Sequence, residues 1–265
     1  MSTFGIALSA TVLAWGLAGA ASAQQFGYAC ETCPTNWAVL SEGFEACGDG
    51  EEQSPIDISE PRRRRLAPVR FDYGEVALAS IDQTVNIELE LEGQAGVRVG
   101  RKRFETLQFH FHSLSEHFLF GEQFDLELHL VHRSADASLL VIGRFIVPGD
   151  PLEGLDEVIA AIEAGGGFEV EDFDLNVFVP STRTSYRYRG SSTTPPCTEG
   201  VRWILLTEPL ELSKDQIERI QLALRDINDG FDNARPLLSR NGRQILTDAR
   251  RRSDDDDDDD GDDDD

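Results

Sequence analysis

The chain has 265 residues, of which 40% are hydrophobic and 8% aromatic. This is enough for one domain of roughly 200–250 residues with a complete core, and it argues against a disordered chain. The net charge is −25, because 49 acidic residues outnumber 24 basic ones. Such an excess of negative charge excludes nucleic acid as an expected partner.

The first segment, residues 1–23, is predicted to be a removable export signal. Gly5 to Ala23 is apolar, and Ala21-Ser22-Ala23 has the small-x-small pattern that signal peptidases accept. Met1 to Gly5 contains no Lys or Arg, so an uncleaved membrane anchor stays the alternative. No other stretch has the roughly 20 apolar residues that span a bilayer. We therefore expect a secreted or periplasmic protein with no membrane contact after cleavage.

Four cysteines suit the oxidising compartment to which a signal peptide delivers: Cys30, Cys33, Cys47 and Cys197. They allow three connectivities. Cys30 and Cys33 form a C-x-x-C motif that can be redox-active or half of a zinc site, but no second C-x-x-C occurs, so a structural bridge is favoured. A Cys47–Cys197 bond would close a loop of about 150 residues and contribute roughly 4–5 kcal/mol.

Between the signal and the C-terminus there is no repeat and no linker, which predicts one domain over about 24–250 and a disordered Asp-rich tail, 251–265. Residues 254–265 are eleven Asp interrupted by Gly261; without them 24 basic and 38 acidic residues remain, a balance of −14. The tail lacks the spacing of an EF-hand, so we expect a solvated segment with at most weak cation binding. The Arg62–Arg65 run is likewise expected to be a solvated loop.

Alternating polar and apolar residues predict strands, which dominate the domain, over 85–91, 108–112, 127–132 and 174–179. Apolar residues at helical spacing predict two helices, over 152–162 and 217–227. Ser213 and Gln216 form a capping box ahead of the second helix. Gly165 to Gly167 is expected to be a loop.

The chemistry of the chain lies in its histidines, of which there are only five: His110, His112, His117, His129 and His132. Alternate residues of a strand share a face, so Gln108, His110 and His112 lie together, with Phe109 and Phe111 opposite. By the same rule Glu127, His129 and Val131 share one face, while Leu128, Leu130 and His132 share the other.

If these two strands are neighbours, His129 meets His110 and His112. Three neutral imidazoles without a thiolate are typical of a catalytic zinc site whose fourth position is open to water. Gln108 and Glu127 then stand where they can orient the ring N–H groups from behind. His117, which follows Glu116 in a loop, and His132, which points away, are expected to be structural.

Six motifs occur in an order that makes the chain resemble the α-class carbonic anhydrases, particularly the shorter secreted bacterial and algal kind. They are Gln53-Ser54-Pro55-Ile56-Asp57-Ile58, Gln108-Phe109-His110-Phe111-His112, Ser115-Glu116-His117, Glu127 to His132, Gly190 to Cys197 and Asn233-Ala234-Arg235-Pro236. The resemblance implies a mainly β (α+β) fold: a large, mostly antiparallel central sheet with short flanking helices and zinc at the base of a conical cleft. It also implies a Cys47–Cys197 disulfide.

The resemblance assigns roles to single residues. His110, His112 and His129 match zinc ligands, with Gln108, Glu127 and Asn233 behind them. Thr193 looks like the gatekeeper that accepts a hydrogen bond from zinc-bound hydroxide and passes its own proton to Glu116, and Thr194 like a substrate contact. The walls of a carbon dioxide pocket are matched by Val131, Val141, Val201 and Trp203. Ser192 stands where the family usually has Leu.

The implied function is the reversible hydration of carbon dioxide to bicarbonate and a proton. Zinc lowers the pKa of its bound water to about 7, a value for which carbonic anhydrase is itself the standard example. Aligned with the family, Gln83 occupies the position of a proton-shuttling histidine and cannot ionise, while Tyr28 matches a cleft-lining tyrosine. Two alternatives stay open: a catalytically silent binding module, and a mineral-associated protein whose Asp-rich tail handles calcium.

Overall fold

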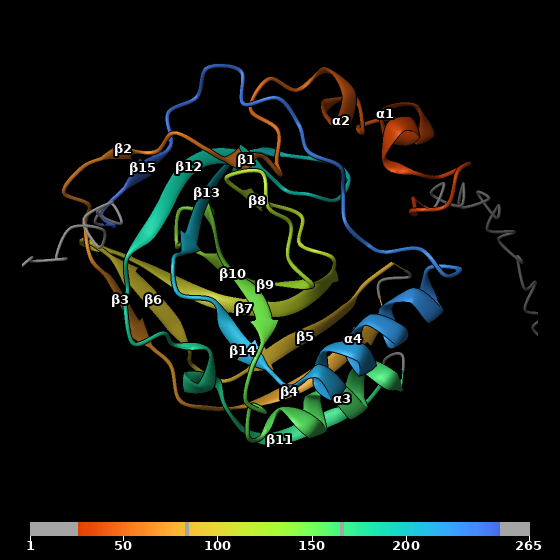
Figure 1. The fold of residues 1–265 in the computed structure, drawn as a ribbon, viewed down its shortest axis with the longest axis vertical. Coiled ribbons are helices and arrows are strands. Elements are labelled where there is room, and N and C mark those ends of the chain that lie inside the picture. The colour runs from red at the N-terminus through yellow and green to blue at the C-terminus, as the bar shows by residue number, and fades with distance from the viewer. Residues whose placement is uncertain (1–25, 83–84, 165–166, 250–265) are drawn as a thin grey trace, which may run out of the picture.

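The computed structural model describes residues 26–82, 85–164 and 167–249, which form one large sheet flanked by short helices (Figure 1). The expected signal peptide, the Asp-rich tail and Gln83 lie outside these ranges, as do Gly165 and Gly166. Within the described ranges, no helix combines the length and the apolar composition needed to cross a membrane.

Thirteen strands build the main sheet, and ten follow its main path in the order β11-β4-β5-β7-β9-β10-β13-β12-β15-β2. Off this path, β14 pairs with β10, and β6 joins β3 to β7. Among the described residues, the pairs β10–β13, β10–β14 and β15–β2 run parallel and the others antiparallel. The predicted mainly β fold with a mostly antiparallel sheet is therefore confirmed.

The strands of this sheet are β2 (Arg62–Arg63), β3 (Val69–Asp72), β4 (Glu75–Asp82), β5 (Ile87–Glu92), β6 (Gly96–Val99), β7 (Lys102–Ser113), β9 (Leu126–Arg133), β10 (Leu139–Pro148), β11 (Glu169–Asp174), β12 (Ser185–Ser191), β13 (Glu199–Leu206), β14 (Leu210–Leu212) and β15 (Leu246–Thr247). A separate parallel pair consists of β1 (Asp57–Ile58) and β8 (Phe118–Leu119). The helices are η1 (Pro34–Asn36), α1 (Trp37–Leu40), α2 (Ala46–Asp49), α3 (Leu155–Glu163), η2 (Leu175–Phe178) and α4 (Lys214–Ile227).

The main core lies between the sheet and the two longer helices, α3 and α4, which pack against each other. Phe109 and Phe111 of β7 are at most 1% exposed and belong to the same core as Val158 of α3 and Ile220 of α4. Burying one such side chain contributes roughly 1.5–3 kcal/mol. This apolar face thus anchors β7, and the opposite face carries the histidines.

The capping box predicted for α4 is confirmed, since Ser213 Oγ accepts from the N–H of Gln216 and Gln216 Oε1 accepts from the N–H of Ser213. Helix α3 begins at Leu155 rather than at Leu152. Gln216 explains the difference, because its side-chain amide also hydrogen-bonds the backbone N–H and C=O of Leu152 and holds them outside the helix.

The predicted strand over 174–179 is wrong, because β11 ends at Asp174 and a 3-10 helix, η2, follows. The Asp174 carboxylate accepts from the N–H of Asn176 and caps this turn. Leu175 and Phe178, three residues apart, are both buried, as the three-residue period of a 3-10 helix allows. Local hydrogen bonding therefore overrides the alternation of the sequence.

The disulfide joins Cys47 to Cys197 with an S–S distance of 2.06 Å, as the resemblance implies. The bridge favoured between Cys30 and Cys33 is absent, since both are free thiols. Cys33 Sγ instead lies 3.2 Å from the carbonyl oxygen of Cys30 and 3.2 Å from Thr35 Oγ1, at the start of η1. These polar contacts hold the Cys33 thiol at the turn in the structure.

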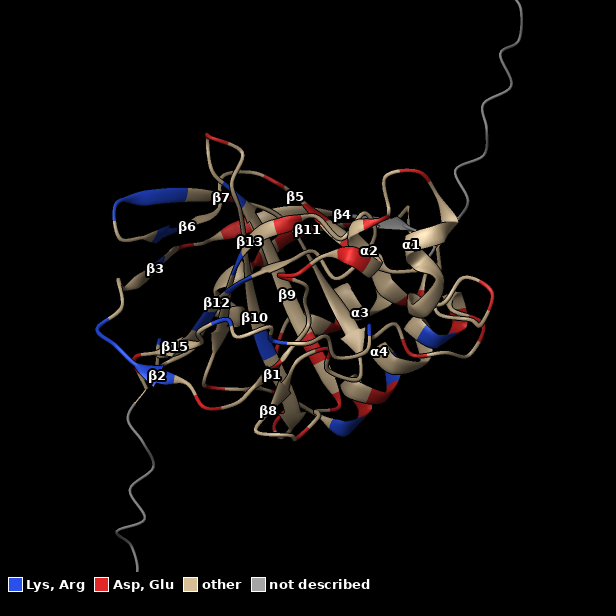
Figure 2. Cartoon of the chain, turned by 90° about the horizontal axis from the view of Figure 1, so that it is seen from above, with Lys and Arg blue, Asp and Glu red and all other residues tan. Residues whose placement is uncertain are grey.

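The charges are unevenly placed: Lys and Arg gather at the end of the molecule that carries β2 and the β6–β7 hairpin (Figure 2). The expectation of a loop over Arg62–Arg65 is corrected in part, because Arg62 and Arg63 form β2, the edge strand beside β15. All four arginines are exposed, as expected.

Candidate metal centre

The site is built on β7 and β9, whose antiparallel register places His110 opposite His129 and His112 opposite Glu127. Directly opposed residues of such strands have Cβ atoms about 4.5–5.5 Å apart, so the imidazoles meet without any loop. The register shifts between Thr106 and Gln108, where a bulge interrupts the ladder just before the first histidine. Bulges of this kind re-aim side chains next to functional sites.

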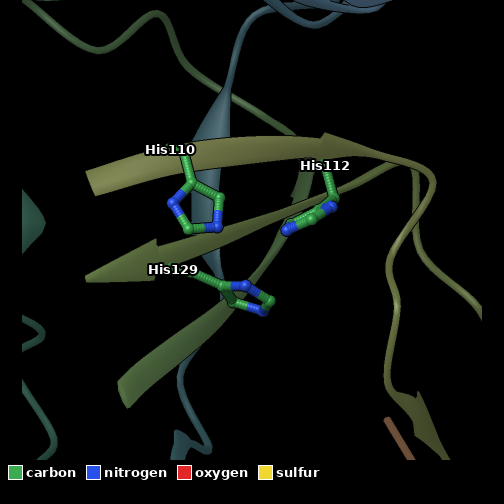
Figure 3. Close-up of side chains that lie close together, drawn as sticks. All are labelled: His110, His112 and His129. Atoms are coloured by element: carbon green, nitrogen blue, oxygen red, sulfur yellow. The ribbon is translucent and has the colours of Figure 1, made fainter. Parts of the chain in front are cut away.

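The three rings point toward one another from these two strands (Figure 3). Each of His110, His112 and His129 offers one nitrogen to a group whose atoms lie within 4.8 Å of one another. Ring centroids are 4.6 Å apart for His112 and His129, and 5.0 Å apart for His110 and His112. The histidines that strand periodicity places on the same faces of the two strands therefore lie together.

The outer nitrogen of each ring has a fixed acceptor. His110 Nδ1 lies 2.8 Å from Gln108 Oε1, and His112 Nδ1 lies 2.7 Å from the carbonyl oxygen of Asn233. His129 Nε2 lies 2.9 Å from Glu127 Oε1. These oxygens only accept hydrogen bonds, so each outer nitrogen carries the proton and each inner nitrogen keeps a lone pair.

Burial favours the neutral form of two of the rings, those of His110 and His112. It holds the pKa of His110 well below its usual value of 6.5, and the neighbouring imidazoles lower that pKa further. Burial likewise lowers the pKa of His112. His112 Nε2, the inner nitrogen, is buried and has no hydrogen-bond partner in the described part of the chain. Three converging lone pairs, one of them left unpartnered in the interior, fit a zinc ion.

Glu116 lies beside this group and is 1% exposed. Its Oε1 accepts from the backbone N–H of Arg235 at 2.9 Å, whereas Oε2 lies 3.4 Å from His112 Nε2 and has no hydrogen-bond partner within 26–82, 85–164 and 167–249. Burial raises the pKa of Tyr28 well above 10.0, and the charge of Glu116 adds to that increase. Tyr28 is therefore a neutral neighbour of this carboxylate.

Glu127 holds two histidines at once. Its Oε1 lies 2.9 Å from His129 Nε2 and 2.8 Å from His117 Nδ1, and its Oε2 accepts from the backbone N–H of His117. Burial alone would raise the pKa of Glu127, but the imidazoles of His117 and His129 hold that pKa well below 4.5. His117, Glu127 and His129 form a second close group, but their facing atoms are occupied by these hydrogen bonds.

His117 continues into a buried hydrogen-bond chain that the sequence did not reveal. His117 Nε2 lies 2.6 Å from the Tyr188 hydroxyl, which lies 2.8 Å from Ser54 Oγ, and Ser54 Oγ in turn accepts from the N–H of Ser191. The Gln53–Ile58 motif and the end of β12 are thereby connected to Glu127. The predicted structural role of His117 agrees with this geometry.

The threonine loop connects β12 to β13 and is fixed by the disulfide at Cys197. Thr193 is 6% exposed and Thr194 partly exposed, and the carbonyl oxygen of Thr194 accepts from the N–H of Cys197 at 2.9 Å. Ser192 Oγ donates to the same carbonyl oxygen at 3.1 Å. Among the described residues, no hydrogen bond joins Thr193 to Glu116.

An apolar wall flanks the histidines. Val141 of β10 is directly paired with Val131 of β9 on one side and with Trp203 of β13 on the other. Val201, 2% exposed, belongs to the same cluster, and the Trp203 ring lies 4.9 Å from that of His129. The four predicted wall residues thus lie together beside the site.

Gly143 is a further residue at the site, and no motif or periodicity in the sequence singles it out. A Cβ atom built on it would lie 2.4 Å from Leu205 Cδ2, 3.1 Å from Glu127 Oε1 and 3.7 Å from His129 Cδ2. A larger residue would force Leu205 to move and would press on Glu127, whose Oε1 contacts His129. Only the register of β9, β10 and β13 reveals this close approach.

Two surface cavities lie elsewhere. One, of about 360 Å³, runs along α4, and the other, of about 520 Å³, lies beside α2 and the end of the threonine loop. Neither is lined by any of the three histidines. The conical cleft that the resemblance implies stays an expectation.

Comparisons with known proteins show the family to which the chain belongs. A family profile described as eukaryotic-type carbonic anhydrase matches residues 32–249. A carbonic anhydrase of Klebsiella pneumoniae is 31% identical over 229 residues, covering 84% of this chain and 91% of its own. Dioscorin DB3S of Dioscorea polystachya is 34% identical over 222 residues, covering 80% and 82%.

Among solved structures, the α-carbonic anhydrase of Thermovibrio ammonificans in complex with sulfanilamide superposes with a TM-score of 0.77. It is 35% identical, and the match covers 83% of this chain and 98% of that one. The profile match, the relatives and the shared fold together show that the chain is an enzyme of the eukaryotic-type, or α, carbonic anhydrase family.

Proposed function

We propose that the chain catalyses the reversible hydration of carbon dioxide to bicarbonate and a proton as a zinc enzyme. The observation that carries this proposal is the convergence of three buried imidazoles, each with its outer nitrogen held by an oxygen acceptor. His110, His112 and His129 would hold the metal. When bound, zinc would lower the pKa of a water molecule to about 7 and so supply a hydroxide nucleophile at neutral pH.

Thr193 and Glu116 would orient the attacking oxygen. Thr193 Oγ1 would accept a hydrogen bond from the nucleophile and donate one to Glu116 Oε2, an acceptor that has no hydrogen-bond partner among the described residues. Glu116 is held by the N–H of Arg235 and, as a carboxylate, only accepts. The direction of both hydrogen bonds would then be fixed, and a lone pair would face the substrate.

The apolar wall of Val131, Val141, Val201 and Trp203 would receive carbon dioxide. This substrate is small and uncharged, so it can leave water at little cost and needs no charged partner in the pocket. Thr194 would contact the substrate from the threonine loop. Ser192, in place of the usual Leu, is partly exposed and turns its hydroxyl to the Thr194 carbonyl oxygen, so its polar group is satisfied within the loop.

Proton release would depend on external buffer. Each turnover would release a proton that must leave the site, and none of the five histidines is available to carry it. Three converge on one another, His117 bonds Glu127, and His132 Nε2 lies 2.8 Å from the Tyr73 hydroxyl. Gln83 cannot ionise, and Tyr28 titrates well above 10.0. Neither can replace an imidazole near pH 7.

The decisive experiment is a stopped-flow assay of carbon dioxide hydration before and after dialysis against a zinc chelator, with metal content measured on the same samples. We expect about one zinc per chain, activity that disappears with it, and recovery when zinc is restored. Less than about half a zinc per chain together with no hydration activity would favour the silent binding module instead.

We further propose that the chain is exported, with residues 1–23 removed, 24–250 as the single domain and 251–265 as its tail. The Cys47–Cys197 disulfide supports an oxidising compartment. N-terminal sequencing of the mature protein tests this: a start near Gln24 is expected, and an intact Met1 in a membrane fraction would favour the anchor. A tail-truncated protein that keeps its turnover but loses binding to carbonate mineral would favour the mineral-associated role.

A further inference from the structure

The edge of the sheet formed by β2 carries an uninterrupted run of exposed arginines, Arg62–Arg65, which we call the Arg strip. Its backbone is well fixed: the N–H of Arg62 donates to Ile245 and that of Arg64 to Thr247, both at 2.8 Å. Within 26–82, 85–164 and 167–249, no carboxylate forms an ion pair with any of the four guanidinium groups. Four adjacent positive charges therefore have no ion-pair partner in this described part of the chain, although residues 1–253 carry a balance of −14.

The chain leaves the described structure at the same place. β15 runs parallel to β2, with Leu246 opposite Arg62 and Thr247 opposite Arg63, and the description ends at Ala249. Figure 2 shows β15 and the arginine-rich β2 side by side at one end of the molecule. Three further arginines, 250–252, and Ser253 then precede the eleven Asp of residues 254–265.

The tail is long enough to contact the Arg strip of its own chain. A chain advances by at most about 3.3–3.6 Å per residue, so residue 254 lies within about 18 Å of Ala249 and residue 265 within about 58 Å. The whole Asp run can thus lie along the Arg strip. A tether this short gives an effective concentration on the order of millimolar, far above that of a separate molecule in dilute solution.

We propose that residues 254–265 dock in cis on the Arg strip, so that this surface is an interaction site for the chain's own acidic tail. Arginines on an edge strand can also prevent strand pairing with other molecules. That role requires no acidic partner, so it does not predict that an acidic peptide binds. Exposed ion pairs are individually weak and screened by salt, so docking requires many charges acting together.

The first test measures binding of a fluorescent peptide with the sequence of residues 254–265 to a chain that ends at Ser253, by polarisation at low ionic strength. The peptide should bind this chain and should bind the full-length chain at least tenfold more weakly, because the tethered tail competes. Binding should disappear at about 1 M salt, where the screening length falls to about 3 Å.

A pair of variants locates the contact. The chain ending at Ser253 is made with its Arg strip neutralised, as Arg62→Gln, Arg63→Gln, Arg64→Gln and Arg65→Gln. The matched control removes the same charge from other exposed arginines, as Arg98→Gln, Arg101→Gln, Arg133→Gln and Arg183→Gln. The strip variant should lose at least tenfold in peptide affinity, and the control should lose less than threefold.

Three results overturn the proposal. Equal losses in the two variants would mean that net charge alone attracts the peptide. Equal peptide affinity of the full-length and shortened chains would mean that the tail does not occupy the strip. Concentration-dependent association of the full-length chain in sedimentation, abolished in its strip variant, would mean that the tail binds a second copy.

Discussion

The five histidines fall into two groups that differ in what their nitrogens contact. In His110, His112 and His129, one nitrogen is held by an oxygen acceptor and the other faces the remaining two rings. His117 instead has both nitrogens engaged, by Glu127 and by Tyr188, and His132 Nε2 is engaged by Tyr73 on the opposite side of the sheet. Among the described residues His132 Nδ1 also lacks a hydrogen-bond partner, so neither burial nor a free nitrogen distinguishes the groups. What marks the first group is that its free nitrogens converge on one another.

The largest effect expected is that of His129→Ala, which removes one of three converging nitrogens. We expect tight zinc binding and carbon dioxide hydration both to be lost, as measured by metal analysis and stopped-flow kinetics. His132→Gln is the matched control from the other group and should keep its zinc. Undiminished zinc content in His129→Ala would contradict the assignment of the first group.

Thr193→Ala tests whether turnover can be lost while zinc binding is kept. The nucleophile would lose the hydroxyl that orients it, so turnover should fall on the order of 100-fold while zinc stays bound. Thr198→Ala, in the same loop but exposed, should leave turnover unchanged. Full turnover in Thr193→Ala would show that this hydroxyl does not act as the gatekeeper.

Glu127→Gln tests the outer acceptor of His129. The amide keeps the size of the carboxylate but loses its charge and half of its acceptor capacity, so zinc affinity should fall about 10–100-fold. The measurement is the rate of zinc release to a chelator, with exposed Glu122→Gln as control. Unchanged release kinetics would mean that the hydrogen bond does not support the ligand.

Gln83→His would add a histidine that belongs to neither group. If proton release limits turnover, the wild-type rate should rise with imidazole-type buffer at fixed pH and ionic strength, and the variant should be faster than wild type at low buffer. A wild-type rate that is high and indifferent to buffer would point to a relay without histidine.

The smallest expected effect is confined to stability and belongs to His132. Burial lowers the pKa of His132 from 6.5 to about 4, so the folded state keeps it neutral while the unfolded chain takes up a proton below about pH 6.5. Stability is therefore lost as the pH falls from 6.5 toward 4, by up to about 3 kcal/mol. Denaturant unfolding should show a shallower pH dependence in His132→Gln, and the wild-type profile in exposed Arg133→Gln. Identical profiles in all three proteins would assign the loss to other groups.

Two features could be predicted because they depend on neighbours along the chain. The period of a strand puts His110 and His112 on one face, and His129 with Glu127 on one face, wherever the strands lie. The capping box of α4 involves atoms only three residues apart. Local rules failed at 174–179, where the Asp174 cap and the burial of Leu175 and Phe178 outweigh alternation.

The sequence by itself therefore determined which side chains share a face and where α4 begins, since both follow from local backbone geometry. Only the tertiary structure decided what faces them: the register of β7 and β9, the carbonyl oxygen of Asn233 behind His112, and the close approach at Gly143. Strand register and contacts to backbone atoms cannot be read from the pattern of side chains along the sequence. They depend on packing between segments far apart in the chain, such as the 121 residues that separate His112 from Asn233.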